Sequence, residues 1–465
     1  MHRRRSGGRG SLRGCYLTGA EESRLAELRI LLRLSVPIAI AQLGLVAMGL
    51  VDTAVIGRLS VDDLAGAGIG RSIGYTSVIL AVGVAMGLEP VAAQAVGAGD
   101  EGRAWRGFVT NLRAGLLLAI PLVGAAFAIT LALPGLGVSA AVVTRVRLYL
   151  LGQAPGLALN ATYFAGRVFL QAHGRTAPAL VGSLVANGIN FVASNLLVRG
   201  DAALTAVGLR PRGLPALGAL GGGIAFSIAT VVLVTFVLVA ALRHRTTSPG
   251  APVRMSTVYR LGIPIGSQLL AEIGIFSLVA LLAGALGAEV ASAHQIAIMM
   301  ASFTFMGALG VSGATAVRVG HAVGAGRNPR RPGGLGIALG AAAMLLGAVA
   351  FAAFPRALVS VFTTDERVIA VGIGLVRIAA VFQLFDGVQA VAAGALRGAG
   401  DVRFPFVANV IAHWFVGFPV ALVLGFALHG GAPGLWWGLT AGLVVISIAL
   451  AARFAVVTRR AIARV

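Results

Sequence analysis

The chain of 465 residues contains no lysine, one cysteine and little charge of either sign. Charged residues make up 11% of it, against about 25% in ordinary soluble domains. The lone Cys15 excludes an intramolecular disulfide and a thiolate metal cluster. Without lysine the chain lacks a Gly-x-x-x-x-Gly-Lys-Ser/Thr phosphate loop, so it does not use ATP through that motif. Because 58% of the residues are hydrophobic, the composition excludes a water-soluble globule.

Long apolar runs fill almost the whole chain, and a membrane-spanning helix needs about 20 such residues. Stretches such as 114–133 and 337–354 are apolar on every face, whereas a β-barrel strand would alternate. We therefore predict an all-α integral membrane protein with twelve spans: 34–56, 73–97, 114–134, 148–170, 177–198, 217–242, 258–286, 294–323, 335–355, 368–396, 404–428 and 434–457.

The arginines lie mainly between the predicted spans, which indicates membrane topology rather than nucleic-acid binding. Twenty-four arginines lie in the two tails and in every second loop, counting Arg260 at the edge of the seventh span. The opposite loops hold 9. The positive-inside rule then predicts a multi-pass protein of the inner (cytoplasmic) membrane with both termini in the cytoplasm. Residues 1–24 form an Arg-rich leader without an apolar core, which we expect to be disordered rather than a signal peptide.

The sequence repeats itself across its two halves. Four anchors share almost one offset: Pro37 with Pro264, Gly57 with Gly284 and Gly97 with Gly324 at 227 residues, and Gln171 with Arg397 at 226. The repeat predicts an N-lobe over 25–242, a cytoplasmic linker over 243–256 and a C-lobe over 257–465. Because six spans is an even number, the lobes are related by a pseudo-twofold along the membrane normal. That arrangement is typical of secondary transporters with a site between the lobes.

Four acidic residues lie inside predicted spans: Asp52, Glu89, Glu272 and Asp386. A charge at the centre of a membrane helix costs about 2.5–3.5 kcal/mol on insertion scales, so such acids are functional candidates. Glu272 and Asp386 fall near the middle of their spans, and the repeat does not pair them with acids in the first half. This asymmetry favours specialised functions over an inherited structural role.

Two carboxylates in one low-dielectric cavity favour uptake of a proton or of a monovalent cation such as Na⁺. Either event removes the negative charge that an organic cation needs, so the ion and the cation compete for the same oxygens, which is the basis of antiport. We assign ion coupling to Glu272, Asp386 and Asp52, with Na⁺ at the Glu272/Asp386 pair as one option. The structural alternative is an acid neutralised by an arginine, for which Arg377 is near enough in sequence to Asp386.

Glu89 precedes Pro90 near the Gly-rich end of the second span, where gating and helix-end solvation are equally good interpretations. Asn187 and Asn190 share a helix face with Ser194, and either line a cavity or bond between helices. The full set of predicted cavity-lining residues is Asn187, Asn190, Asn160, Gln42, Gln268, Phe382 and Gln389.

At these residues the sequence resembles the multidrug and toxic compound extrusion (MATE) family, and its NorM-like branch in particular. The resemblance covers residues 25 to about 457. It is carried by four motifs: Met48-Gly-Leu-Val-Asp52-Thr53, Pro90-x-x-x-Gln94-x-x-Gly97-Ala98-Gly99, Ala293-His294-Gln295 after Glu272, and Asp386-Gly387-x-Gln389 before Leu396-Arg397-Gly398.

The resemblance implies a V-shaped, two-lobed antiporter that exports organic cations or drugs in exchange for Na⁺ or H⁺. It places Glu272 and Asp386 in the C-lobe cation site and Asp52 in the N-lobe. Many relatives carry Tyr where this chain has Phe382, and Asp or Asn where it has Ser194. We expect a monomer without a cofactor, whose partners are small organic cations and the lipid bilayer.

Two alternatives remain. A lipid-linked precursor flippase of related fold would present cationic side chains to phosphates, whereas the intramembrane charges here are mainly acidic. An integral membrane enzyme that modifies lipids would need a sizeable soluble loop, and the loops of this chain are too short for one.

Overall fold

The computed structural model describes residues 23–465, which are helices joined by short turns and loops. Almost all of the predicted leader at 1–24, including Cys15, lies outside the described residues. The helices of the first half are α1 (Arg24–Ile56), α2 (Val61–Met86), α3 (Leu88–Gly97), α4 (Glu101–Ile129), α5 (Ala140–Ala172), α6 (Ala177–Arg199), α7 (Asp201–Thr205) and α8 (Gly218–Leu242), with a 3₁₀ turn at Pro134–Leu136.

The second half repeats this order. Its helices are α9 (Met255–Ala285), α10 (Ala288–Gly324), α11 (Arg330–Ala353), α12 (Pro355–Ser360), α13 (Glu366–Gly398), α14 (Arg403–Val410), α15 (Phe418–Leu422) and α16 (Gly431–Val457). The π-helical segment Ile411–Gly417 joins α14 to α15, and a second one, Val423–Ala427, continues α15, so that Arg403–Ala427 forms one span.

Local sequence signals set where several helices begin. The side chains of Ser23, Ser60, Asp100 and Ser139 each accept a hydrogen bond from a backbone N–H in the first turn of the helix that follows. Such N-caps satisfy amide groups that have no partner within the helix.

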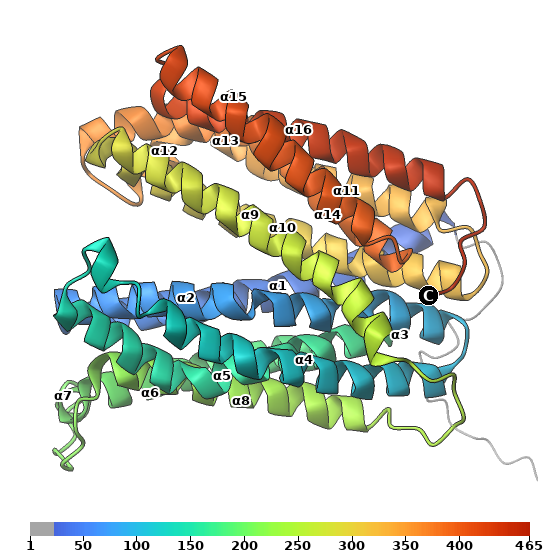
Figure 1. Cartoon of the computed structure of the whole chain (residues 1–465), viewed down its shortest axis with the longest axis horizontal. Coiled ribbons are helices and arrows are strands. Elements are labelled where there is room, and N and C mark those ends of the chain that lie inside the picture. The colour runs from blue at the N-terminus through green and yellow to red at the C-terminus, as the bar shows by residue number, and fades with distance from the viewer. Residues whose placement is uncertain (1–22) are drawn as a thin grey trace, which may run out of the picture.

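Eleven helical segments of the described chain are long and apolar enough to cross a membrane, counting Val61–Gly97 as one. The 33-residue α5 lies among them as the twelfth long helix (Figure 1). The prediction of an all-helical membrane protein is therefore confirmed. The predicted span at 114–134 begins too late, since α4 starts at Glu101. The residues from Leu25 to Arg33 continue α1 without a break rather than forming a separate surface helix.

The helices form two lobes, with α1–α8 below and α9–α16 above in Figure 1. The lobes contact each other through α1 with α10, α2 with α9, and α3 with α10. Glycines permit this approach: a Cβ on Gly83 would collide with the backbone of Gly266, and one on Gly324 would collide with the backbone of Gln94. We call this contact region the lobe junction.

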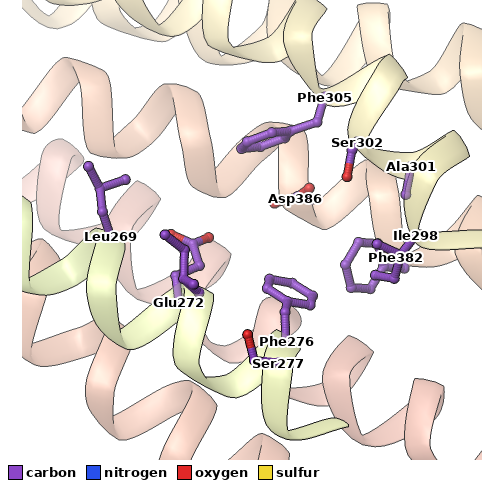
Figure 2. Close-up of a pocket in the computed structure, with 11 residues that line it drawn as sticks. Leu269, Glu272, Phe276, Ser277, Ile298, Ala301, Ser302, Phe305, Phe382 and Asp386 are labelled. Carbon is purple, nitrogen blue, oxygen red and sulfur yellow. The ribbon is translucent and has the colours of Figure 1, made fainter. Parts of the chain in front are cut away.

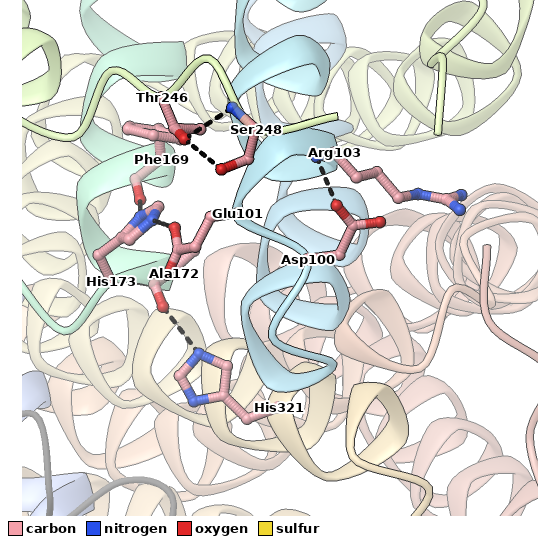
Figure 3. Close-up of polar contacts among 9 residues, drawn as sticks. All are labelled: Asp100, Glu101, Arg103, Phe169, Ala172, His173, Thr246, Ser248 and His321. Atoms are coloured by element: carbon pink, nitrogen blue, oxygen red, sulfur yellow. Dashed lines mark hydrogen bonds and ion pairs between the residues drawn. The ribbon is translucent and has the colours of Figure 1, made fainter. Parts of the chain in front are cut away.

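Buried polar contacts connect the lobes at the junction. Arg318 of α10 donates to Glu27 of α1 at 2.8 and 2.5 Å, and Arg397 of α13 donates to Glu89 of α3 at 3.0 Å. The His321 ring of α10 donates to the carbonyl oxygen of Ala172 of α5 at 2.7 Å (Figure 3). The junction is thus joined by charge and hydrogen bonds as well as by close packing.

Candidate functional site

A cavity of about 350 Å³ opens within the C-lobe, between α9, α10 and α13. Its walls are mainly apolar and contain two carboxylates (Figure 2). The lining residues are Leu269, Glu272, Ile273, Phe276, Ser277, Ile298, Ala301, Ser302, Phe305, Phe382 and Asp386. A hollow of this size and polarity is suited to a small amphipathic molecule.

Glu272 of α9 and Asp386 of α13 both face this cavity. Within residues 23–465, neither forms an ion pair with an arginine or histidine, so Arg377 does not neutralise Asp386. Glu272 accepts one long hydrogen bond, at 3.4 Å, from the amide of Gln389. Glu272 and Asp386 are close enough for their negative charges to repel each other. Arg397 attracts Glu272, although it lies beyond ion-pair distance. The pair is thus available to an ion or to a cationic molecule.

The donor set of the pair fits a monovalent cation. The amide oxygen of Gln389 is buried and has no hydrogen-bond partner within residues 23–465, so it can add a third ligand group to the two carboxylates. Oxygen ligands are those that hard cations prefer. In the described chain no three His, Cys, Asp or Glu side chains gather as a metal site. The oxygens of Glu272, Asp386 and Gln389 therefore fit an exchangeable monovalent cation.

Aromatic rings form the wall beside the acids. Phe382 packs against Phe276 at 6.1 Å and against Trp436 at 5.5 Å between ring centroids. The Trp436 indole donates to Nδ1 of His294 at 3.1 Å, which fixes the ring edge. Sequence reasoning identified Phe382 but missed Phe276, Ser302 and Phe305, because side chains of these types at helical spacing are equally typical of lipid-facing positions.

Asp52 of α1 lies in the N-lobe and is fully buried. Its Oδ1 accepts hydrogen bonds from Ser194 at 2.6 Å and Asn190 at 3.0 Å, both on α6. Its Oδ2 is buried and has no hydrogen-bond partner among the described residues. The structure therefore brings Asp52 of the first predicted span together with Asn190 and Ser194 of the fifth, and leaves one carboxylate oxygen available to hold a proton.

The other predicted residues have varied surroundings. The Asn187 amide bonds the carbonyls of Gly44 and Ser183, so it joins α6 to α1. Asn160 on α5 and Gln268 on α9 are buried, and Glu89 lies in the junction ion pair with Arg397. These placements favour helix packing for Asn187 and put Glu89 in an ion pair that joins the two lobes.

Sequence reasoning missed Arg167, which lies inside the predicted span 148–170. It is buried in α5 and donates to Gln42 of α1, one of the predicted cavity residues. Its guanidinium carbon lies 4.5 Å from the centre of the Phe164 ring. The signal was available, because an arginine in an apolar run is as unusual as an acid.

Known proteins resemble the chain over nearly its whole length. The sequence model of the MatE family matches residues 37–196 and 264–423, two segments of equal length. They are separated by the same offset as the internal repeat. A probable multidrug resistance protein NorM of Deinococcus radiodurans is 39% identical over 94% of this chain and 97% of its own length. The multidrug resistance protein NorM of Burkholderia vietnamiensis is 35% identical over 93% of this chain and 94% of its own.

Solved structures share the fold. A eukaryotic MATE transporter, AtDTX14, has a TM-score of 0.81 with 22% identity, covering 95% of this chain and 99% of its own. A MATE protein in the straight conformation has a TM-score of 0.82 with 18% identity, covering 93% and 97%. The repeat, the two lobes, the intramembrane acids and the two-segment match agree, and the chain is a member of the MatE family of membrane transporters.

Proposed function

We propose that this protein is a secondary antiporter that exports organic cations or drugs in exchange for Na⁺ or H⁺. One observation carries the proposal: Glu272 and Asp386 line an apolar cavity and form no ion pair within the described chain. Relatives that cover most of the chain are named as multidrug resistance proteins, which supports the same substrate class.

The coupling follows from competition for the acid pair. Inward Na⁺ or H⁺ occupies the carboxylates from the outer side, so a bound organic cation loses its counter-charge and leaves. Linkage makes this effect reciprocal, because the cation also displaces the ion. Asp52 with its unpartnered Oδ2 serves as a second proton-binding position in the N-lobe.

The lobes would move relative to each other about the junction. We assign the N-lobe to residues 25–242, the linker to 243–256 and the C-lobe to 257–465, with Glu89 as a gating residue. The arginine distribution supports an inner-membrane location with both termini in the cytoplasm. The protein would act as a monomer and catalyse no covalent chemistry.

The test is efflux from proteoliposomes with the ion gradients imposed one at a time. Ethidium loaded on the substrate side should move against its gradient when an opposing Na⁺ or pH gradient is applied. With neither gradient, accumulation should stop. Movement that is independent of both gradients would refute antiport, and movement driven by only one of them would identify the coupling ion.

A further inference from the structure

Arg167 is a buried cation whose partners among residues 23–465 are uncharged. Only 5% of its surface is exposed. Its guanidinium donates to the amide oxygen of Gln42 and lies over the Phe164 ring. The Tyr163 ring is 6.0 Å from the guanidinium carbon, and the uncharged hydroxyls of Tyr163 and Tyr75 are close enough to interact with the charge. Within residues 23–465 no Asp or Glu forms an ion pair with it.

The Nε–H of Arg167 is also buried and has no hydrogen-bond acceptor in the part of the chain that the structure describes. A guanidinium presents several donors in a plane and matches a carboxylate with two parallel bonds. A buried charge without a counter-charge is strongly unfavourable. Uncharged contacts satisfy this side chain only in part, so its surroundings are better suited to a visiting anion than to permanent packing.

The position of Arg167 is just beyond the lobe junction. Ser35 and Ala39 of α1 pack directly against Gly310 of α10, so the lobes are closed at that level. Gln42, one turn further along α1, is only half-buried. Tyr75 of α2, near Arg167, keeps 39% of its surface exposed. Arg167 therefore lies beside the first accessible residues past the point where the lobes meet.

We propose that Arg167 and Gln42 form a binding subsite for a carboxylate carried by the transported molecule. The subsite deepens the proposed export function and rests on it. The acids Glu272 and Asp386 line a cavity in the C-lobe, and Arg167 lies in the N-lobe apart from Asp52, which is bonded to Ser194 and Asn190, so an acidic site and a cationic site lie in different lobes. A compound with both an amine and a carboxylate has one partner in each lobe, whereas a simple cation uses only the C-lobe acids.

The test uses a matched pair of dyes: a rhodamine with a free benzoate carboxylate and the methyl ester of the same dye. The dyes share one ring system and one cationic group and differ only in the anion. Affinity is measured by fluorescence anisotropy on the purified full-length protein, and transport by efflux from proteoliposomes. Arg167→Gln should weaken binding and slow efflux of the acid about tenfold, since a charge-assisted hydrogen bond is removed. The ester should change less than about twofold because it makes no such bond.

Two variants serve as controls. Arg331→Gln removes the same charge from an exposed position in the first turn of α11 and should change neither dye. Arg167→Lys keeps the charge without the planar donors, and should retain part of the preference for the acid. Because the readout is the ratio of acid to ester, a general loss of folded protein does not imitate the expected result.

Equal loss of both dyes in Arg167→Gln would overturn the subsite in favour of a structural role. An unchanged acid-to-ester ratio would overturn it too. If the wild-type protein binds both dyes but exports neither, the proposed antiport function fails, while the affinity ratio still decides whether Arg167 binds the carboxylate.

Discussion

Glu27 and Arg318 form a two-bond ion pair across the lobes, with Nε to Oε1 at 2.8 Å and Nη2 to Oε2 at 2.5 Å. Both side chains are less than one-tenth exposed. The pair joins α1 to α10, and the apolar residues Leu31, Leu34, Ala314 and Val317 pack beside it. An alternating-access movement that opens the junction has to separate these charges.

Removing one partner should therefore favour opening of the junction. Breaking a buried ion pair from one side costs about 3–5 kcal/mol while the other charge stays buried, and opening hydrates it. Val317 is nearly fully buried at the junction, so a cysteine introduced there reports opening. In a protein that carries Cys15→Ser and Val317→Cys, Glu27→Gln should accelerate maleimide labelling of the introduced cysteine. Stopped-flow or gel-shift labelling measures the rate.

The exchanged pair, Glu27→Arg with Arg318→Glu, is the matched control and should return labelling towards the parent rate. As a surface comparison, Glu366→Gln breaks the exposed pair with Arg356 and should have no effect. Labelling that is as slow in Glu27→Gln as in the parent would show that packing alone holds the junction closed.

Neutralising the C-lobe acids should stop export. Glu272→Gln and Asp386→Asn keep the size of each side chain but remove the charge that competes between ion and substrate. We expect ethidium efflux in membrane vesicles to fall to the level of vesicles without the protein. Glu289→Gln, which removes an exposed acid paired with Arg367, should export normally. Normal efflux by both neutral variants would remove the acid pair from the mechanism.

Much of the fold was predictable because the bilayer imposes it. Apolar runs of spanning length and a repeat at one offset define the helices and lobes without knowledge of contacts. The start of α4 was predicted 13 residues late, at 114 instead of Glu101, because Arg103, Arg106 and Arg113 continue the helix outside the apolar core. Hydropathy detects the part of a helix that lies in lipid and not its solvated end.

The site was predictable only where a residue type is unusual in lipid. Glu272, Asp386 and Asp52 stood out as acids, whereas the walls of the cavity are ordinary apolar residues. The partnership of Glu27 with Arg318 spans 291 residues, so no local pattern indicates it. Arg167 is less evident from the sequence because the arginines of this chain lie mainly at the ends of apolar runs, where they indicate topology rather than burial.

Phe382→Tyr should distinguish Na⁺ from H⁺ as the coupling ion. The ring lines the cavity together with Asp386 and is almost fully buried, so the added hydroxyl offers one more oxygen beside the acids. If Na⁺ binds there, half-maximal efflux should require a lower Na⁺ concentration. If the ion is a proton, the Na⁺ response should stay flat in both proteins. Phe404→Tyr, outside the cavity, is the matched control.

The loop after α7 should depend on one carboxylate outside the membrane. Backbone N–H groups of Arg212, Gly213 and Leu214 donate to Asp201 at 2.8 to 3.1 Å, and these bonds hold the pKa of Asp201 below its usual value. A lowered pKa in the folded state means that the carboxylate stabilises the loop above the pKa of the unfolded chain. This stabilisation is lost as the pH falls through the folded pKa.

Asp201→Asn should therefore accelerate hydrogen exchange at the three donating amides at neutral pH, because the amide side chain is a weaker acceptor than a carboxylate. Mass spectrometry of the loop peptide measures this, and peptides of α5 serve as the internal reference. Asp62→Asn, an exposed acid in the first turn of α2, should leave the exchange of the loop unchanged. The Leu217 amide also donates to the Leu197 carbonyl at 2.9 Å. Equal exchange in Asp201→Asn and wild type would mean that this bond and the turn of α7 are enough to order the loop without the charge of Asp201.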